Sequence, residues 1–173
     1  MKKITAISVV SLLLLASCGG KGKDAASMDY GLEEANEVIS YYNTSIDITK
    51  KMVDMGEISK IIDYMQKNGK TLVAPVVIRT PVSATDTTAL LNPGDCFPSS
   101  AADSLKMYYR RFFDVSKRLY ANYDAYRAYI KAEDYKDDNY AKGNEICKEE
   151  KELAEQIPGL RSQIYALLYS LCR

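Results

Sequence analysis

The chain has 173 residues, and its 23 lysines and arginines balance its 23 aspartates and glutamates. A body without net positive charge lacks the electrostatic footprint that nucleic acid requires, so we expect no nucleic-acid partner. The sequence has no histidine, which removes the commonest general base and the commonest metal ligand. We therefore expect no metal centre, no cofactor and no histidine-assisted nucleophile.

Residues 1–17 have the features of a secretory signal peptide. Met1-Lys2-Lys3 is a positive n-region, and residues 4–15 form an apolar h-region. That run is too short to cross a bilayer, because a spanning helix needs roughly 20 apolar residues. Leu15-Ala16-Ser17-Cys18 resembles the lipobox of bacterial lipoproteins, in which the cysteine is acylated after cleavage. We predict cleavage before Cys18 and a lipid such as palmitate on it. The alternative is an ordinary secretory signal.

A lipid on Cys18 defines the expected location of the protein. Two or more acyl chains give stable anchoring, whereas one chain binds only marginally. Residues 18–28 read as a flexible tether with a reach on the order of 15 to 20 Å. The domain of residues 29–173 is then held near the cell membrane or the outer membrane, facing the periplasm or the cell exterior. The sequence leaves the choice of membrane and of face open.

A first long helix is predicted from about Asp29, its expected N-cap, with acidic residues in the first turn. The apolar spacing loses phase near Gly56, which predicts a kink or short break. Asn68-Gly69 supplies a stop signal. The predicted apolar seam recurs at steps of three and four residues and consists of Leu32, Ala35, Ile39, Tyr42, Ile46, Thr49 and Val53.

The stretch 70–103 is predicted to be a long irregular connection, because the helical period is lost and four prolines punctuate it. Residues 72–82 are apolar and β-branched, which favours an extended segment lying on the helices. Asn92-Pro93-Gly94-Asp95 has the composition of a tight turn.

A second long helix is predicted from about Ser100 to about Lys136, a length of roughly 50 Å. Its predicted apolar seam consists of Leu105, Tyr108, Phe112, Val115, Leu119, Asn122, Tyr126 and Tyr129.

A third helix is predicted after the cap cluster Asp137-Asp138-Asn139. Pro158-Gly159 admits a kinked continuous helix or a turn between two short helices, and the uninterrupted apolar register favours the kink. In a continuous helix Cys147 and Cys172 lie roughly 37 Å apart and cannot form a disulfide, whereas a reversal would let them pair. Together with Cys96 they make an odd number, so at least one thiol stays free or pairs with another chain.

The fold class predicted from these elements is all-α. It is an antiparallel bundle of three long helices, the last kinked or split, with a long irregular loop between the first two.

Eight tyrosines lie between Tyr108 and Tyr140, on more than one face of the second helix. An aromatic surface for glycan or peptide contact is one interpretation, and a wide core with hydroxyls that reach solvent is the favoured one. The residues nominated for ligand contact are Tyr109, Tyr120, Tyr123 and Tyr135.

The acidic cluster Glu133, Asp134, Asp137 and Asp138 is the one nominee for chemistry. It lacks the spacing and internal glycine of a calcium-binding EF-hand loop, so capping of helices is the better account. The spacing singles out no pair of carboxylates suited to glycoside hydrolysis.

Residues 134–143, Asp-Tyr-Lys-Asp-Asp-Asn-Tyr-Ala-Lys-Gly, and Tyr41-Tyr42-Asn43 resemble the YiiG-like bacterial lipoproteins, a domain family of unknown function. The resemblance extends loosely over residues 29–173. It implies a lipoprotein signal and a helical fold, and supplies no catalytic residues. Members usually run longer, so the resemblance implies that this chain is either the first half of the family's architecture or a shortened relative.

The function expected from the sequence is a non-enzymatic binding or structural module, held on the membrane through lipid on Cys18, with an unknown envelope protein or glycan as partner. The alternative is an envelope hydrolase that uses carboxylates of the 133–138 turn. A third hypothesis is assembly through the unpaired cysteine or an exposed seam.

Overall fold

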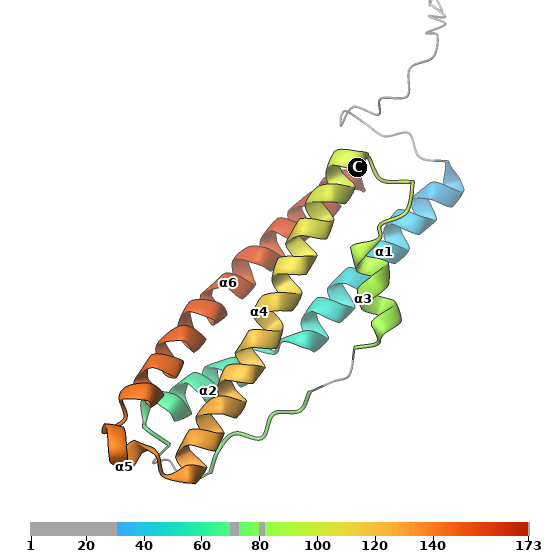
Figure 1. The fold of residues 1–173 in the computed structure, drawn as a ribbon. Coiled ribbons are helices and arrows are strands. Elements are labelled where there is room, and N and C mark those ends of the chain that lie inside the picture. Colours follow the sequence, from blue (N-terminus) through green and yellow to red (C-terminus); the bar gives the residue numbers. More distant parts are fainter. Residues whose placement is uncertain (1–30, 70–72, 80–81, 173) are drawn as a thin grey trace, which may run out of the picture.

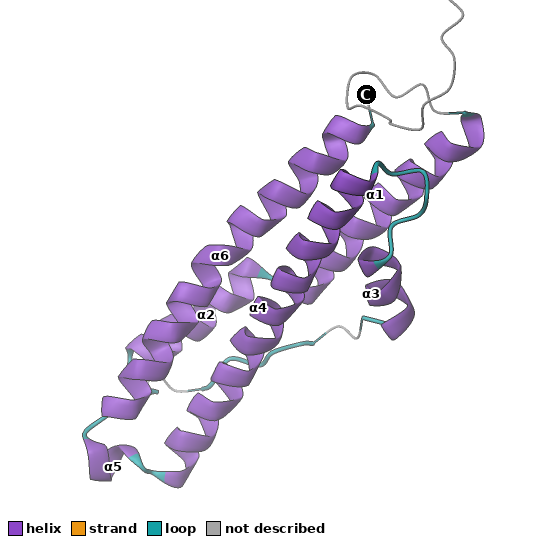
Figure 2. Ribbon diagram, turned by 45° about the horizontal axis from the view of Figure 1, so that its top comes forward, coloured by secondary structure: helices purple, strands orange, loops and turns teal. Residues whose placement is uncertain are grey.

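The computed structural model describes residues 31–69, 73–79 and 82–172. The predicted signal peptide 1–17, Cys18, the tether 18–28 and the cap Asp29 lie outside these residues. The described part is all-helical and contains no strand, which confirms the fold class (Figure 2). Its helices are α1 (Leu32–Met52), α2 (Met55–Gln66), α3 (Ala84–Leu91), α4 (Ser99–Ala132), α5 (Tyr135–Asp138) and α6 (Ala141–Leu171).

The helices form three rods (Figure 1). α4 and α6 are antiparallel, are joined through the single turn α5 and make the most extensive contact in the fold. α1 and α2 follow each other as the third rod, and α3 packs against both α1 and α4. The predicted count of three long helices is therefore not confirmed, because the first is divided and the connection contains a helix of its own.

The first rod runs parallel to α4, which corrects the predicted antiparallel arrangement of neighbours. Three tyrosine hydroxyls define the register: Tyr109 of α4 donates to Ser45, Tyr120 to the carbonyl of Met52 and Tyr126 to the carbonyl of Met65. Residue numbers thus rise together along the two rods. The reason is the long connection, which runs back along the bundle before α4 begins (Figure 1).

The break expected near Gly56 is confirmed, and it falls at Val53-Asp54. Val53 is extended, and the Asp54 side chain caps α2 by accepting the N–H groups of Gly56 and Glu57 at 2.7 and 3.2 Å. On the other side of the break, Arg161 of α6 donates to the carbonyl of Thr49 at 2.7 Å and also to that of Val53. A cation at a helix C-terminus is favoured by the helix dipole and replaces the missing backbone donors.

The connection is only partly irregular. α3 forms in the proline-free stretch between Pro81 and Pro93, and Ser83 Oγ caps it by accepting the N–H of Asp86 at 3.0 Å. Residues 73–79 are extended without strand pairing. The turn expected at residues 92–95 closes slightly later, through a bond from the N–H of Phe97 to the carbonyl of Gly94.

α4 ends four residues before the predicted Lys136, because Glu133 adopts a left-handed conformation. α6 passes through Pro158 without a break, so the continuous reading of Pro158-Gly159 is confirmed. Cys96, Cys147 and Cys172 are all free, the first two buried and the last exposed.

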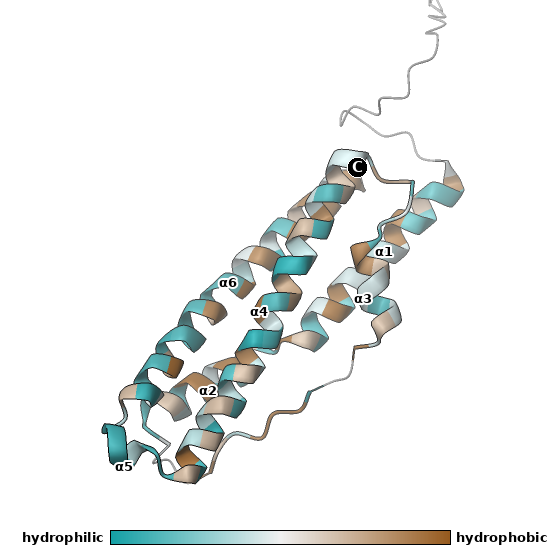
Figure 3. Ribbon diagram, in the orientation of Figure 1, coloured by the Kyte–Doolittle hydropathy of each residue, from teal (hydrophilic) through white to brown (hydrophobic). Residues whose placement is uncertain are grey.

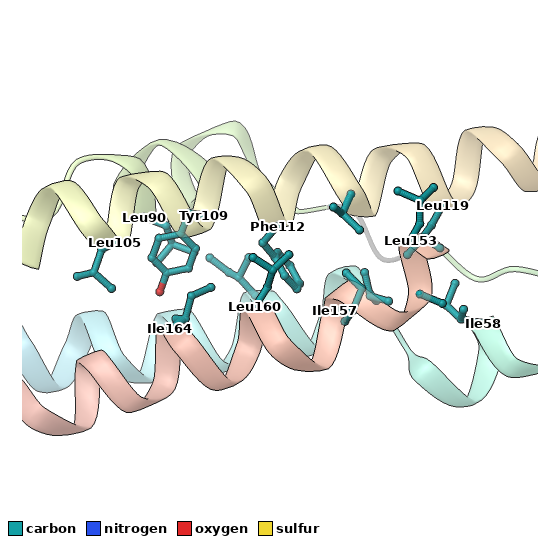
Figure 4. Close-up of a cluster of buried hydrophobic side chains, with 14 of the residues drawn as sticks. Ile58, Leu90, Leu105, Tyr109, Phe112, Leu119, Leu153, Ile157, Leu160 and Ile164 are labelled. Carbon is teal, nitrogen blue, oxygen red and sulfur yellow. The ribbon is translucent and has the colours of Figure 1, made fainter. Parts of the chain in front are cut away.

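The core fills the space between α4, α6, the first rod and α3, and leucine and isoleucine side chains pack there around Tyr109 and Phe112 (Figure 4). Gly143 has a packing role in it, because a Cβ there would lie 2.8 Å from the ring of Tyr129. The predicted apolar seam of the first helix is confirmed at Thr49 and Val53, which are buried, and is wrong at Leu32 and Ile39, which are 84% and 52% exposed. The buried side chains of α1 are Val38, Ser45, Ile48 and Thr49.

Tyrosine hydroxyls hold the rods together. Besides the three bonds already given, Tyr41 donates to the carbonyl of Leu90 at 2.7 Å and Tyr123 to that of Pro75 at 2.5 Å. Met52 and Leu90 lie at helix C-termini, where backbone carbonyls lack intrahelical donors. Burial raises the pKa of Tyr123 and Tyr126. These phenols therefore stay protonated as donors at physiological pH.

Replacing Tyr123 by phenylalanine should destabilise the fold by about 1 to 2 kcal/mol. The hydrogen bond to the carbonyl of Pro75 is lost, and that carbonyl is left without its donor. Urea denaturation measures this change, and hydrogen exchange of residues 73–79 should rise with it. Tyr108→Phe is the control, since the ring is half-buried and no hydroxyl bond is described for it. Equal stabilities of the two variants would contradict the assigned role.

Candidate functional site

A groove of about 700 Å³ lies between α2 and α6. Its size falls within the range of small-molecule sites, roughly 300 to 1,000 Å³. The polar residues that line it are Ser59, Lys60, Asp63, Gln66, Lys151 and Glu155. The apolar residues that line it are Met55, Ile58, Ile62, Ala154 and Pro158. An apolar lining with both signs of charge suits a ligand that has an apolar body and polar ends.

Pro158 gives this groove a hydrogen-bond acceptor. A proline has no backbone N–H, so the carbonyl of Ala154, one turn earlier on α6, cannot receive its usual helical bond. Both residues line the groove. The sequence pattern therefore places a backbone acceptor next to an apolar lining, where a ligand's N–H or O–H could take the place of the missing donor.

Glu150 lies one turn before Ala154 and is the only fully buried carboxylate among the described residues. Neither of its oxygens has a hydrogen-bond partner in the described part of the chain. Burial, reinforced by the charge of neighbouring Glu149, raises the pKa of Glu150 to about 8. Burying an ionised carboxylate without a partner costs free energy, so the Glu150 side chain is mostly protonated at neutral pH.

A cluster of hydroxyl groups lies inside the bundle, where α1, α4 and α6 meet. The hydroxyls of Thr49 and Tyr165 are 2.5 Å apart, and Tyr109 donates to Ser45. Thr49 also donates to the carbonyl of Ser45 at 2.8 Å. Each of these groups has a partner, so the cluster aligns the rods and offers no free group to a ligand.

The four nominated tyrosines do not form one surface. Tyr109 and Tyr123 are fully buried, so they cannot contact a ligand at the surface and the packing interpretation holds for them. Tyr120 is half-buried beneath Arg79, whose guanidinium carbon is 5.3 Å from the ring centroid. Tyr135 stacks on Tyr140 at 4.8 Å with nearly parallel rings, beside α5.

The acidic cluster does not converge on a cleft. Glu133 is paired with Lys136, and Asp138 accepts the hydroxyl of Tyr129 at 2.6 Å and the N–H of Lys142 at 3.0 Å. The bond from Tyr129 lowers the pKa of Asp138, while burial and that bond raise the pKa of Tyr129 to about 12. Asp134 and Asp137 are exposed. The hydrolase hypothesis thus lacks the arrangement of carboxylates on which it depended.

The described residues contain no group of three or more cysteine, aspartate or glutamate side chains that could hold a metal ion. The same residues include no helix long and apolar enough to span a bilayer.

Sequence reasoning missed Glu150, Arg161 and the groove. The signal for Glu150 was present, because it occupies the seam of α6 between Cys147 and Ala154, where a charge is unexpected. The groove had no such signal, since it depends on how α2 and α6 meet.

The fold and the groove define an elongated helical domain with a cleft between two of its rods. The chain belongs to the DUF6845 family, a domain of unknown function, whose model matches residues 29–172. Comparison with curated proteins gave no match.

Solved structures from Bacteroides are similar to this chain. A DUF3829 family protein from Bacteroides vulgatus ATCC 8482 is 35% identical with a TM-score of 0.71, covering 79% of this chain and 89% of that one. An alpha helical protein from Bacteroides fragilis NCTC 9343 is 31% identical with a TM-score of 0.66, and 81% of this chain covers 53% of it. A DUF3829-like protein from Bacteroides thetaiotaomicron VPI-5482 is 25% identical with a TM-score of 0.64, and 82% of this chain covers 50% of it. The chain thus spans about half of the last two proteins.

Glu150 should make stability fall as the pH rises. Its pKa in the fold, about 8, is higher than the ordinary glutamate value, so the folded chain holds a proton that the unfolded chain has lost. The free energy of unfolding should therefore decrease between about pH 5 and 8, by up to about 1.4 kcal/mol per pH unit.

Urea denaturation at several pH values measures this dependence. Glu150→Gln should flatten it, whereas Glu152→Gln, at an exposed position of the same helix, should leave the slope unchanged. A slope that survives in Glu150→Gln would show that another group carries it.

Proposed function

We propose that this protein is a lipid-anchored binding module of the bacterial cell envelope, without catalytic activity, which holds an envelope protein or glycan in the groove between α2 and α6. The anchor is inferred from the lipobox-like Leu15-Ala16-Ser17-Cys18. The tether of residues 18–28 keeps the domain within a short distance of the membrane.

The observation that carries the proposal is the composition of the groove. It combines an apolar lining, an acceptor carbonyl at Ala154 and charges of both signs, which are features of recognition.

The finer family assignment is part of the same proposal. We infer from residues 134–143 that the chain is a YiiG-like lipoprotein, within the wider group of helical domains to which the comparisons assign it. The turn has a structural role that fits such a motif: Asp138 bonds to Tyr129, and Gly143 admits the Tyr129 ring.

Filling the groove should abolish partner capture. Ser59 is exposed and lines the groove, so Ser59→Trp should block it without disturbing the core. Ser162→Trp is the matched control, because Ser162 is an exposed serine of α6 outside the groove.

The measurement is affinity capture from detergent-solubilised native envelopes. We expect an envelope protein or glycan that wild type and Ser162→Trp retain and that Ser59→Trp loses. Identical profiles for all three proteins would refute the groove as the binding site.

The anchor has its own test. Metabolic labelling with an alkyne fatty acid should modify the mature protein, and Cys18→Ala should abolish the label and release the protein from the membrane fraction. Mass spectrometry of the wild-type amino terminus gives an independent measurement. An unmodified terminus would remove the lipid from the proposal and leave the groove prediction intact.

A further inference from the structure

We propose that the extended segment 73–79 and the adjacent face of α4 form a second membrane contact, a surface that binds an anionic lipid bilayer directly. This inference goes beyond ligand binding in the groove, and it does not depend on lipid at Cys18.

Exposed apolar side chains concentrate on this segment. Val73, Val76 and Ile78 are 77%, 81% and 78% exposed. Within the described residues, the other exposed large apolar side chains are spread over three helices, and only Leu32 among them is as exposed as these three. The segment is also visibly hydrophobic along the side of the bundle (Figure 3). Exposed apolar side chains grouped in this way are typical of a protein or membrane contact.

The segment is held in place, so these side chains are displayed on a fixed backbone. Tyr123 donates to the carbonyl of Pro75 at 2.5 Å, and the N–H of Ile78 donates to Glu57 of α2 at 3.0 Å. Ala74 and Val77 pack against the core. Because side chains alternate along an extended chain, the inward position of Val77 directs Val76 and Ile78 toward solvent.

Cations line one face of α4, whose C-terminal half contacts the segment through Tyr123 and Asp124. Lys106, at the far end of this face, pairs with Asp103. The basic stripe of α4 consists of Lys106, Arg110, Lys117, Arg127 and Lys131. At 3.6 residues per turn these five positions fall within about 100° of one another around the helix. Arg111 and Arg118, which are also exposed on α4, bond to Gln156 and Glu149 of α6.

Arg79 extends the basic stripe to the segment itself. Its guanidinium lies over the Tyr120 ring and is 2.5 Å from Asp124. Arg127 lies over the Tyr123 ring, with its guanidinium carbon 5.7 Å from the centroid. Asp124 and Glu57 are the carboxylates nearest the segment, so cations are in excess on this face of a chain whose formal charge is zero.

Three cavities of about 240, 300 and 330 Å³ line the junction of the segment and α4. Each is lined by two of the cations Arg79, Lys117, Arg127 and Lys131, and the second and third are also lined by Asp124, which pairs with Arg79. Cavities of this kind suit phosphate-bearing headgroups, while Val76 and Ile78 enter the boundary between headgroups and acyl chains.

The combination distinguishes this face from other exposed apolar positions. Leu32 is 84% exposed, but it lies beside Glu33, Glu34 and Glu37, which an anionic membrane repels. An acidic protein partner would match the charges of α4, yet it would leave no reason for the exposed valines and isoleucine. A bilayer accounts for both features, and we therefore assign this surface to the membrane.

The test is sedimentation of the chain from Gly19 to Arg173, which contains the whole helical body, with vesicles of phosphatidylglycerol and phosphatidylcholine. Binding is expected at low salt, with a loss in 0.5 M salt on the order of tenfold because exposed charges are screened. Vesicles of phosphatidylcholine alone should bind weakly.

Two variants separate the contributions of charge and apolar contact. Lys117→Gln/Arg127→Gln and Val76→Ser/Ile78→Ser should each weaken binding by on the order of tenfold. The matched controls, Lys50→Gln/Lys148→Gln and Leu32→Ser/Met107→Ser, change exposed residues elsewhere and should bind like wild type. Circular dichroism melts establish that all variants fold.

Equal binding to neutral vesicles, or undiminished binding by either test variant, would overturn the proposal. So would a lack of vesicle binding accompanied by charge-dependent binding to soluble polyglutamate, which would assign the surface to an acidic protein. Loss of the fatty-acid label in the anchor experiment has no bearing on the result, because the tested chain lacks Cys18.

Discussion

The arrangement of the rods depends on donors that α4 and α6 supply to the backbone carbonyls of the interrupted first rod. A helix end leaves carbonyls without partners, and the break at Val53-Asp54 places one such end inside the bundle. Tyr120 and Arg161 supply donors there. Since a buried carbonyl without a donor costs roughly 1 to 3 kcal/mol, the break is stable only with these side chains in place.

The same constraint explains the high tyrosine content. α4 has its closest backbone contacts with α6 and α3, and it reaches the first rod through long side chains. Phenylalanine would fill that space equally well, but only tyrosine combines a large apolar ring with a donor at its tip. The rings of Tyr64 and Tyr126, in an edge-on pair 5.9 Å apart, show the packing that accompanies the hydroxyl bond to Met65.

The sequence allowed the all-helical class, the break near Gly56, the stop at Asn68-Gly69 and the continuity of α6 to be predicted. Each depends on local chemistry, such as capping, glycine geometry or apolar period. The direction of α4 relative to the first rod could not be predicted, because a connection of this length can either turn back early or cross the whole bundle. The phase of α1 was only partly predicted, because Thr49 and Val53 of the predicted seam are buried, whereas Ser45, which Tyr109 contacts, is also buried and was not in it.

The candidate groove was beyond sequence reasoning for a related reason. Its apolar residues, such as Ile62 and Ala154, fit an ordinary core seam, and nothing local marks them as partly open. They face a groove because α2 and α6 are covered by α4 on one side and by no further helix at this position in the described chain.

Glu150 and the segment 73–79 are two features that lower the stability of the isolated domain. A buried carboxylate without partners and three exposed β-branched side chains are each unfavourable in an isolated domain. Neither is needed for the rods to pack, since leucine at position 150 and polar residues at 76 and 78 would suit the same backbone. Departures of this kind are typical of functional sites. Here the exposed side chains lie beside α4, and the buried Glu150 lies one turn from Ala154, which lines the groove.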